Sequence, residues 1–136
     1  ARQPELAGRV HLPGPLPHAE ISSLLAAADA YALPSLLEGM SNALLEAMQM
    51  KLPILASDLP TQQEVLLCAS REPAGLLLNP DDIPAWTAAI GRLTDDVTWR
   101  EQLSAAAAAR ATDFSLQTMV DGFQQALGLG PQAGSR

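Results

Sequence analysis

Residues 31–57, YALPSLLEGMSNALLEAMQMKLPILAS, constrain the fold of this chain more than any other segment. A short apolar run ends at Pro34, a polar loop and an amphipathic helical pattern follow, and a second apolar run starts after Pro53. Two short apolar strands joined by a helix predict a parallel pair, because parallel strands need a crossover connection. The loop before the helix then lies at the carboxyl edge of the sheet, where α/β folds bind their ligands.

The same alternation of apolar runs and helical patterns extends over most of the chain. It predicts strands at residues 10–12, 30–33, 54–57 and 76–78, with helices between them, and three further helices at residues 83–93, 97–111 and 116–127. The fold class is therefore α/β, with a partial Rossmann-like parallel sheet of about four strands flanked by helices, and with C-terminal helices. We expect one domain over residues 1–128 and a flexible tail over residues 129–136.

Composition limits both the core and the partners. Apolar residues make up 48% of the chain and aromatic residues only 4%, so small and aliphatic side chains must build the core. The net charge of −7 argues against nucleic acid as a partner, because phosphate binding needs clustered lysine and arginine. A single cysteine, Cys68, permits no internal disulfide, and no apolar window of about 18 residues predicts a membrane span. We expect a cytoplasmic location and, because Ala1 is no initiator methionine, a piece of a longer protein.

The polar loop and the following helix hold the candidate site. Backbone N–H groups at a helix start lack internal partners and suit a phosphate or a sugar hydroxyl, and here they belong to residues 40–42, while Gly39 lets the backbone approach a ligand closely. Glu38 precedes this start and Glu46 lies one turn beyond Asn42, with seven residues between the two carboxylates. The two could accept hydrogen bonds from different hydroxyls of one polyol. The alternative is a pair of solvated carboxylates that flank a helix.

Single residues predict where helices begin, and the two histidines raise the question of a metal site. Thr61 begins a capping-box pattern, and Asp82 and Ser115 are expected to cap the helices that follow them. His11 and His18 flank a proline-rich loop, but a metal site needs three or four ligands and no third partner is evident. No metal site is therefore expected.

The order LPSLLEGMSNALLEAM, followed by PILAS, resembles the C-terminal, nucleotide-sugar-binding domain of retaining GT-B glycosyltransferases of glycosyltransferase family 4 (glycosyl transferases group 1). That family carries an E-x7-E motif in this strand-loop-helix setting. Further resembling segments are ADAYALPS at residues 28–35, EV at 64–65, AGLLLNP at 74–80 and FS at 114–115. The resemblance covers roughly residues 9–127.

The resemblance implies a role for each site residue. Glu38 is expected to contact the hydroxyls of the donor sugar as the catalytic residue, and Glu46 is expected to bind the ribose hydroxyls of the nucleotide. The backbone beside the sugar and the diphosphate belongs to Gly39, Met40, Ser41 and Asn42. Such enzymes need no metal ion and no cofactor, because backbone amides and basic side chains hold the diphosphate.

The resemblance also implies partners. The donor is a nucleotide-diphosphate sugar, and the whole enzyme transfers its sugar to a hydroxyl acceptor with retention, in bacterial polysaccharide or glycoconjugate biosynthesis. Peripheral attachment at the inner face of the membrane is expected of the whole enzyme. This chain has neither the N-terminal GT-B domain nor the glycine loop and Arg/Lys pair that hold the diphosphate, so alone it is expected to be inactive.

Two choices stay open at this point. Lys51 stands where the family often has glycine, so either it adopts a positive φ at a cost of about 1 kcal/mol or the helix ends differently. For function, a non-catalytic binding or interaction module and a nucleotide-sugar epimerase of GT-B architecture remain alternatives. A dinucleotide oxidoreductase is disfavoured, because no G-x-G-x-x-G opens the chain.

Overall fold

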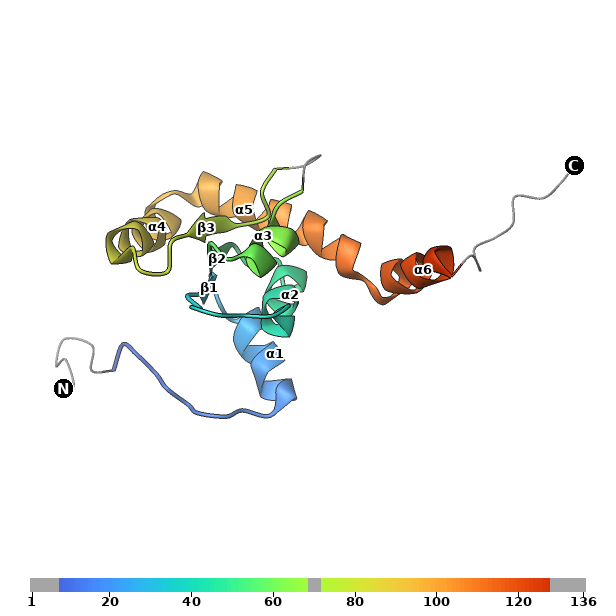
Figure 1. Ribbon diagram of the computed structural model, residues 1–136. Coiled ribbons are helices and arrows are strands. Elements are labelled where there is room, and N and C mark those ends of the chain that lie inside the picture. The colour runs from blue at the N-terminus through green and yellow to red at the C-terminus, as the bar shows by residue number, and fades with distance from the viewer. Residues whose placement is uncertain (1–7, 69–71, 128–136) are drawn as a thin grey trace, which may run out of the picture.

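A three-stranded parallel sheet forms the centre of the molecule (Figure 1). The computed structural model describes residues 8–68 and 72–127. The strands are β1 (Tyr31–Leu33), β2 (Ile54–Ser57) and β3 (Leu76–Leu78), in the order β1-β2-β3. In the register, Tyr31 lies opposite Ile54, and Ala56 lies opposite Leu77. The predicted α/β class with a parallel sheet is confirmed.

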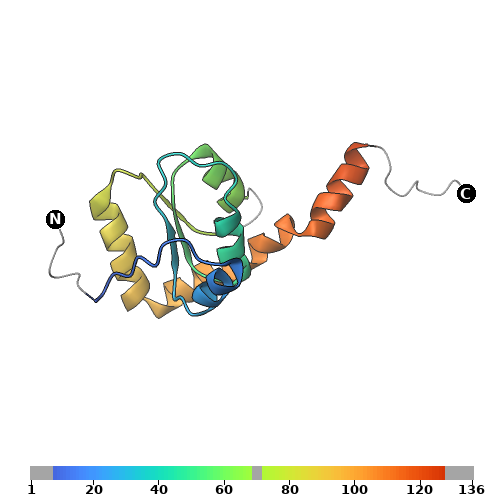
Figure 2. The same cartoon turned by 90° about the horizontal axis from the view of Figure 1, so that it is seen from below.

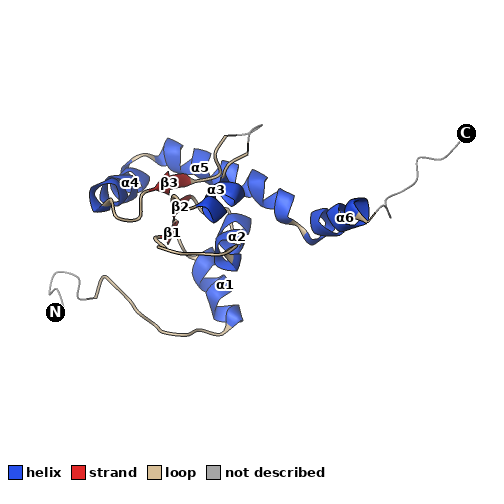
Figure 3. Ribbon diagram, in the orientation of Figure 1, coloured by secondary structure: helices blue, strands red, loops and turns tan. Residues whose placement is uncertain are grey.

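Helices cover both faces of this sheet (Figures 2 and 3). Each strand is followed by a helix, and the C-terminal part is helical throughout. The helices are α1 (His18–Ala26), α2 (Asn42–Gln49), α3 (Pro60–Leu66), α4 (Ile83–Asp95), α5 (Val97–Ala111), the short 3-10 helix η2 (Thr112–Phe114) and α6 (Leu116–Ala126).

The central strand β2 divides the core into two clusters. Side chains alternate across a strand, so Ile54 and Ala56 face one side and Leu55 faces the other. The larger cluster packs Ile54 and Ala56 against α1, α2, α3 and α5. The smaller cluster packs Leu55 against α4, where Trp86 is buried and its indole N–H donates to the Asn79 carbonyl at 3.0 Å.

The predicted strand at residues 10–12 is wrong, because this segment is coil. Val10 and Leu12 are 54% and 90% exposed. Among the described residues, β1 pairs with β2 alone and residues 10–12 pair with no strand, so this segment makes no ladder hydrogen bonds. A strand without a ladder gains no such bonds, and its apolar pattern alone does not hold it extended. The predicted tail, residues 129–136, lies outside the described residues.

Helix α2 ends in a Schellman motif at Lys51. The amide of Leu52 donates to the Ala47 carbonyl at 3.1 Å, and the amide of Lys51 donates to the Met48 carbonyl at 3.0 Å. These two bonds require a left-handed residue after the helix, and Lys51 has φ of 60°. Of the two alternatives for this helix end, Lys51 therefore adopts the positive φ.

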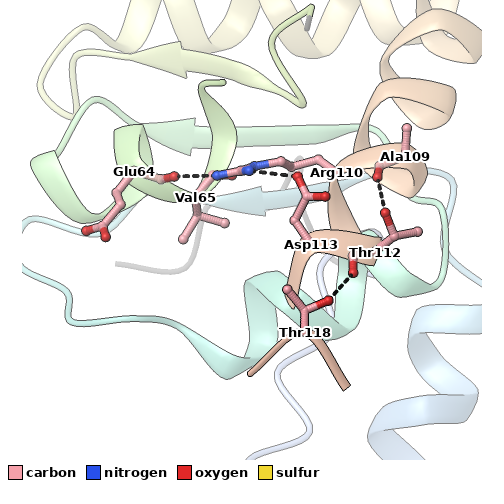
Figure 4. Close-up of polar contacts among 7 residues, drawn as sticks. All are labelled: Glu64, Val65, Ala109, Arg110, Thr112, Asp113 and Thr118. Atoms are coloured by element: carbon pink, nitrogen blue, oxygen red, sulfur yellow. Dashed lines mark hydrogen bonds and ion pairs between the residues drawn. The ribbon is translucent and has the colours of Figure 1, made fainter. Parts of the chain in front are cut away.

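Arg110 fastens the end of α5 to the end of α3 (Figure 4). Its guanidinium donates to the Val65 carbonyl at 2.8 Å and to the Glu64 carbonyl at 2.8 Å, and it forms an ion pair with Asp113 at 2.8 Å. The last carbonyls of a helix lack partners inside the helix, so Arg110 satisfies two of them at the end of α3.

Helix α6 extends away from the sheet (Figure 1). Its start is capped by Ser115 as predicted, whose hydroxyl accepts a hydrogen bond from the Thr118 amide at 3.1 Å. It has no buried residue, and its apolar side chains are exposed: Leu116, Met119, Val120 and Phe123. Within the described residues, no helix is long and apolar enough to cross a membrane.

Candidate functional site

The candidate site lies on the loop between β1 and α2. Residues 34–41 leave the carboxyl end of β1 and return into α2, so they lie at the edge where parallel sheets bind ligands. Gly39 and Met40 are exposed, and a Cβ added at Gly39 would meet no atom within 4 Å. Nothing in the described chain covers the backbone at this position, so a ligand can approach it closely.

The start of α2 presents free backbone donors. Ser41 is the N-cap, and its hydroxyl accepts a hydrogen bond from the Leu44 amide at 3.4 Å. Among the described residues, the backbone amides of Met40, Ser41 and Asn42 donate no hydrogen bond to another residue. Unpaired amides at a helix start carry partial positive charge, so this end of α2 suits an anion or a sugar hydroxyl.

Glu38 is held at both its side chain and its backbone. The Ser35 hydroxyl donates to the Glu38 carboxylate at 3.0 Å, and the Thr61 hydroxyl lies 3.1 Å from the Glu38 carbonyl. Glu46 lies further along α2 and, like Glu38, is half-buried. The ion pairs of the described chain are Arg92 with Asp96 and Arg110 with Asp113, so neither site carboxylate is used in one. Both remain available to a ligand.

Tyr31 connects the two carboxylates electrostatically. Burial, and then the negative charges of Glu38 and Glu46, raise the pKa of the Tyr31 phenol above its ordinary value of 10.0. A neighbouring negative charge disfavours the phenolate, and this effect requires proximity. The two carboxylates thus add to the effect of burial in disfavouring the phenolate of Tyr31, which lies on the strand that leads into the site loop.

The predicted capping box at Thr61 is wrong. Helix α3 begins two residues earlier than that pattern predicts, with Leu59 as N-cap and Pro60 at its first position. Proline is favoured there because it has no N–H group that needs a partner and its φ is already helical. Thr61 therefore lies in the first turn, where its hydroxyl is free to reach the loop at Glu38.

Three contributors to the site were missed from the sequence: Tyr31, Ser35 and Thr61. Ser35 had a usable signal, because serine hydroxyls often bond to groups a few residues away and Glu38 is three residues on. Thr61 had no local signal, since its partner lies 23 residues away in the chain. Within residues 8–68 and 72–127, no three histidine, cysteine, aspartate or glutamate side chains are grouped closely enough to share a metal ion.

The chain is similar in sequence to known glycosyltransferases. The sequence profile of the family described as "Glycosyl transferases group 1" matches residues 1–96. The chain is 33% identical over 108 residues to the O-antigen chain mannosyltransferase B of Escherichia coli, covering 79% of this chain and 27% of that protein. It is 37% identical over 86 residues to the MMP alpha-(1->4)-mannosyltransferase of Mycolicibacterium hassiacum, covering 63% of this chain and 20% of that protein.

A solved structure shares the fold. The chain superposes on sucrose-phosphate synthase from Thermosynechococcus elongatus with a TM-score of 0.74 and 26% sequence identity. The match covers 91% of this chain but 32% of that one. The chain thus spans about a fifth to a third of the length of these proteins.

Proposed function

The chain belongs to the glycosyl transferases group 1 family and has the GT-B fold, and from that premise we propose that it is the donor-binding part of a retaining glycosyltransferase. The whole enzyme transfers a sugar from a nucleotide-diphosphate sugar to a hydroxyl acceptor. The observation that carries this proposal is the β1–α2 junction. There, the backbone amides at the start of α2 donate to no described residue, and two half-buried carboxylates outside the described ion pairs flank them in the chain.

Each group of the β1–α2 junction binds a different part of the donor. Glu38 accepts hydrogen bonds from the hydroxyls of the sugar and orients it for transfer. The backbone of residues 39–42 faces the diphosphate, where partial positive charge stabilises the negative charge that develops on the leaving group. Glu46 accepts from the ribose hydroxyls. These groups bind the donor without a metal ion or another cofactor.

Exposed apolar surface on the chain supports contact with another part of the enzyme. Among the described residues β1 pairs on one side only. Beside it a groove of about 460 Å³ lies between the sheet and α4, lined by Ala32, Leu55, Ile90 and Leu93 and by charged side chains that include Asp29 and Arg100. The apolar side chains of α6 are exposed as well. Contiguous apolar surface marks contact sites. We assign these surfaces to the rest of the enzyme, including an N-terminal GT-B domain, so residues 1–128 alone are inactive.

The relatives suggest a setting for the reaction. One of them is named as an O-antigen chain mannosyltransferase and comes from a bacterium. By analogy, the enzyme that contains this chain acts in bacterial polysaccharide or glycoconjugate biosynthesis. It works in the cytoplasm, at the inner face of the membrane.

Ligand titration of the whole protein that carries this chain tests the proposal. Calorimetry with a panel of nucleotide-diphosphate sugars is expected to find at least one that binds, and binding by none of them refutes the donor site. The ribose assignment is tested by comparing the matching nucleoside diphosphate with its 2′,3′-dideoxy analogue. The wild type is expected to bind the analogue about tenfold to a hundredfold more weakly, because hydrogen bonds to a carboxylate are lost.

A matched pair of variants separates the site from general charge effects. Glu46→Gln is expected to abolish most of the discrimination between ribose and dideoxyribose. Glu101→Gln removes the same charge from the exposed surface of α5 and is expected to keep the discrimination. Equal discrimination in wild type and Glu46→Gln shows that Glu46 does not bind the ribose.

A further inference from the structure

Helix α3 reaches the site loop through a single hydroxyl group. Thr61 Oγ1 lies 3.1 Å from the Glu38 carbonyl oxygen and 2.9 Å from Oε1 of Gln62. Gln62 is only 1% exposed, and its Nε2 has no hydrogen-bond partner in the described part of the chain. A buried amide donor without a partner is costly, so this cluster beside Glu38 needs an explanation.

Counting hydrogens decides which end of the Gln62 amide faces Thr61; the other end has no described partner in either orientation. A hydroxyl has one hydrogen, so Thr61 cannot donate fully to both the Glu38 carbonyl and Gln62 Oε1. The oxygen and nitrogen of a side-chain amide are distinguished by their hydrogen bonds. With the Gln62 amide turned by 180°, its nitrogen donates to Thr61 Oγ1, and the hydroxyl hydrogen is left for the Glu38 carbonyl. This orientation gives a continuous chain of donors, from Gln62 to Thr61 to Glu38.

We propose that Gln62 is a positioning residue for the Glu38 loop, acting through Thr61. The Gln62 amide occupies a lone pair of the Thr61 oxygen and directs the hydroxyl hydrogen toward the Glu38 carbonyl. Without that donor, a threonine hydroxyl in the first turn of a helix can rotate to a carbonyl of the preceding residues instead. The loop then loses its tie to α3. The consequence for ligands rests on the proposed donor site.

Few other contacts hold the loop in place. Leu36 and Leu37 are 73% and 92% exposed, so the apolar side chains of the loop do not pack against the core. The Ser35 bond to Glu38 is local and moves with the loop. The Thr61 bond instead ties the loop to a helix that Arg110 anchors at its other end. It is therefore placed to set where the sugar-facing Glu38 lies relative to α2.

Three variants of the whole protein test this inference. Gln62→Met removes the amide donor at similar length, and Thr61→Val removes the hydroxyl at similar volume. Thr61→Ser keeps the hydroxyl and serves as the conservative control. Hydrogen exchange is read at the amides of Leu44 and Leu45, which donate to Ser41 at the end of the loop. It is expected to accelerate about threefold to tenfold in the first two variants, because one hydrogen bond that holds the loop is lost, and to stay at the wild-type rate in Thr61→Ser.

Ligand binding supplies a second readout that a general loss of stability would not produce. Affinity for the nucleotide-diphosphate sugar is expected to fall about threefold to tenfold in Gln62→Met and Thr61→Val. Affinity for the nucleoside diphosphate without the sugar is expected to fall less, since Glu46 and the amide of Asn42 lie on α2 and do not depend on the Thr61 bond. The double variant is expected to lose no more than the larger single loss, because both substitutions break the same chain of donors.

The outcomes separate this inference from the proposed function. Wild-type exchange rates at the amides of Leu44 and Leu45 in Gln62→Met overturn the positioning role, whatever ligand binds. Equal losses of affinity for both ligands overturn it too, since they indicate a general structural effect. If the wild type binds no nucleotide sugar, the donor-site proposal fails, and the exchange rates still decide whether Gln62 holds the loop.

Discussion

Replacing Lys51 by glycine is expected to stabilise the protein. Lys51 ends α2 with φ of 60°, in the left-handed region that glycine enters without a steric penalty. The conformation is imposed by its surroundings. The amides of Lys51 and Leu52 complete the Schellman motif, Leu52 is only 5% exposed, and the Ser104 hydroxyl donates to the Lys51 carbonyl at 2.5 Å. The residue therefore cannot relax to a negative φ without breaking these contacts.

The magnitude follows from two opposing effects. The left-handed conformation costs a non-glycine residue about 1–2 kcal/mol, and this strain is relieved in Lys51→Gly. Glycine has more backbone freedom in the unfolded chain, which offsets about 0.5–1 kcal/mol of that relief. The free energy of unfolding is therefore expected to rise by about 0.5–1 kcal/mol. For a chain of this size, that corresponds to a rise in Tm of about 2–4 °C.

Urea and thermal unfolding of three proteins check this reasoning: wild type, Lys51→Gly and Lys51→Ala. Alanine removes the lysine side chain and its charge but keeps the steric penalty at positive φ, so Lys51→Ala is expected to gain nothing. An equal gain in both variants places the effect in the lysine side chain and refutes the backbone explanation. A loss of stability in Lys51→Gly refutes it as well.

Two further predictions concern the site and the sheet. Tyr31 is the chain's single tyrosine, so ultraviolet titration reports the ionisation of its phenol directly. Its pKa is expected above 10.0 and is expected to fall toward that value in Glu46→Gln. The stability linked to the raised pKa is present below pH 10 and is lost as the pH rises through that pKa. An unchanged pKa in Glu46→Gln contradicts the proximity of the two groups. In Gly75→Ala the new Cβ would lie 2.9 Å from Cβ of Ile54, so urea unfolding is expected to show a loss of about 1–3 kcal/mol. Gly91→Ala, in open space within α4, is the control and is expected to gain about 0.5–1 kcal/mol.

The parts of the fold that follow from local pattern were predictable. The three strands β1, β2 and β3 were expected at residues 30–33, 54–57 and 76–78, because each is a short apolar run bounded by proline, glycine or polar residues. Residues 10–12 show the same pattern and form no strand. The difference lies in whether the segment pairs with another strand, which residues 10–12 do not do. A local pattern carries no information about that.

The candidate site also has a part that local sequence predicts and a part that it does not. The loop, the free amides and the positions of Glu38 and Glu46 follow from one strand-loop-helix junction, which local sequence specifies. The contacts of Thr61 with Glu38 and of Arg110 with α3 join residues 23 and 45 or more positions apart in the chain. Such contacts depend on how α3 and α5 pack, so they required the structure. The positive φ of Lys51 was open for the same reason, since a buried Leu52 decides it.

Charge constrains how an acidic chain can bind an acidic donor. The chain has a net charge of −7, and the proposed ligand carries a negative diphosphate. Two unit charges 4 Å apart interact by about 1 kcal/mol in water and more strongly at a half-buried site, so a carboxylate beside the phosphate would oppose binding. Glu38 and Glu46 are therefore compatible with the donor only if they bind its hydroxyls, with the amides of α2 nearest the phosphates. That separation is a physical reason for placing the two carboxylates on either side of a helix start.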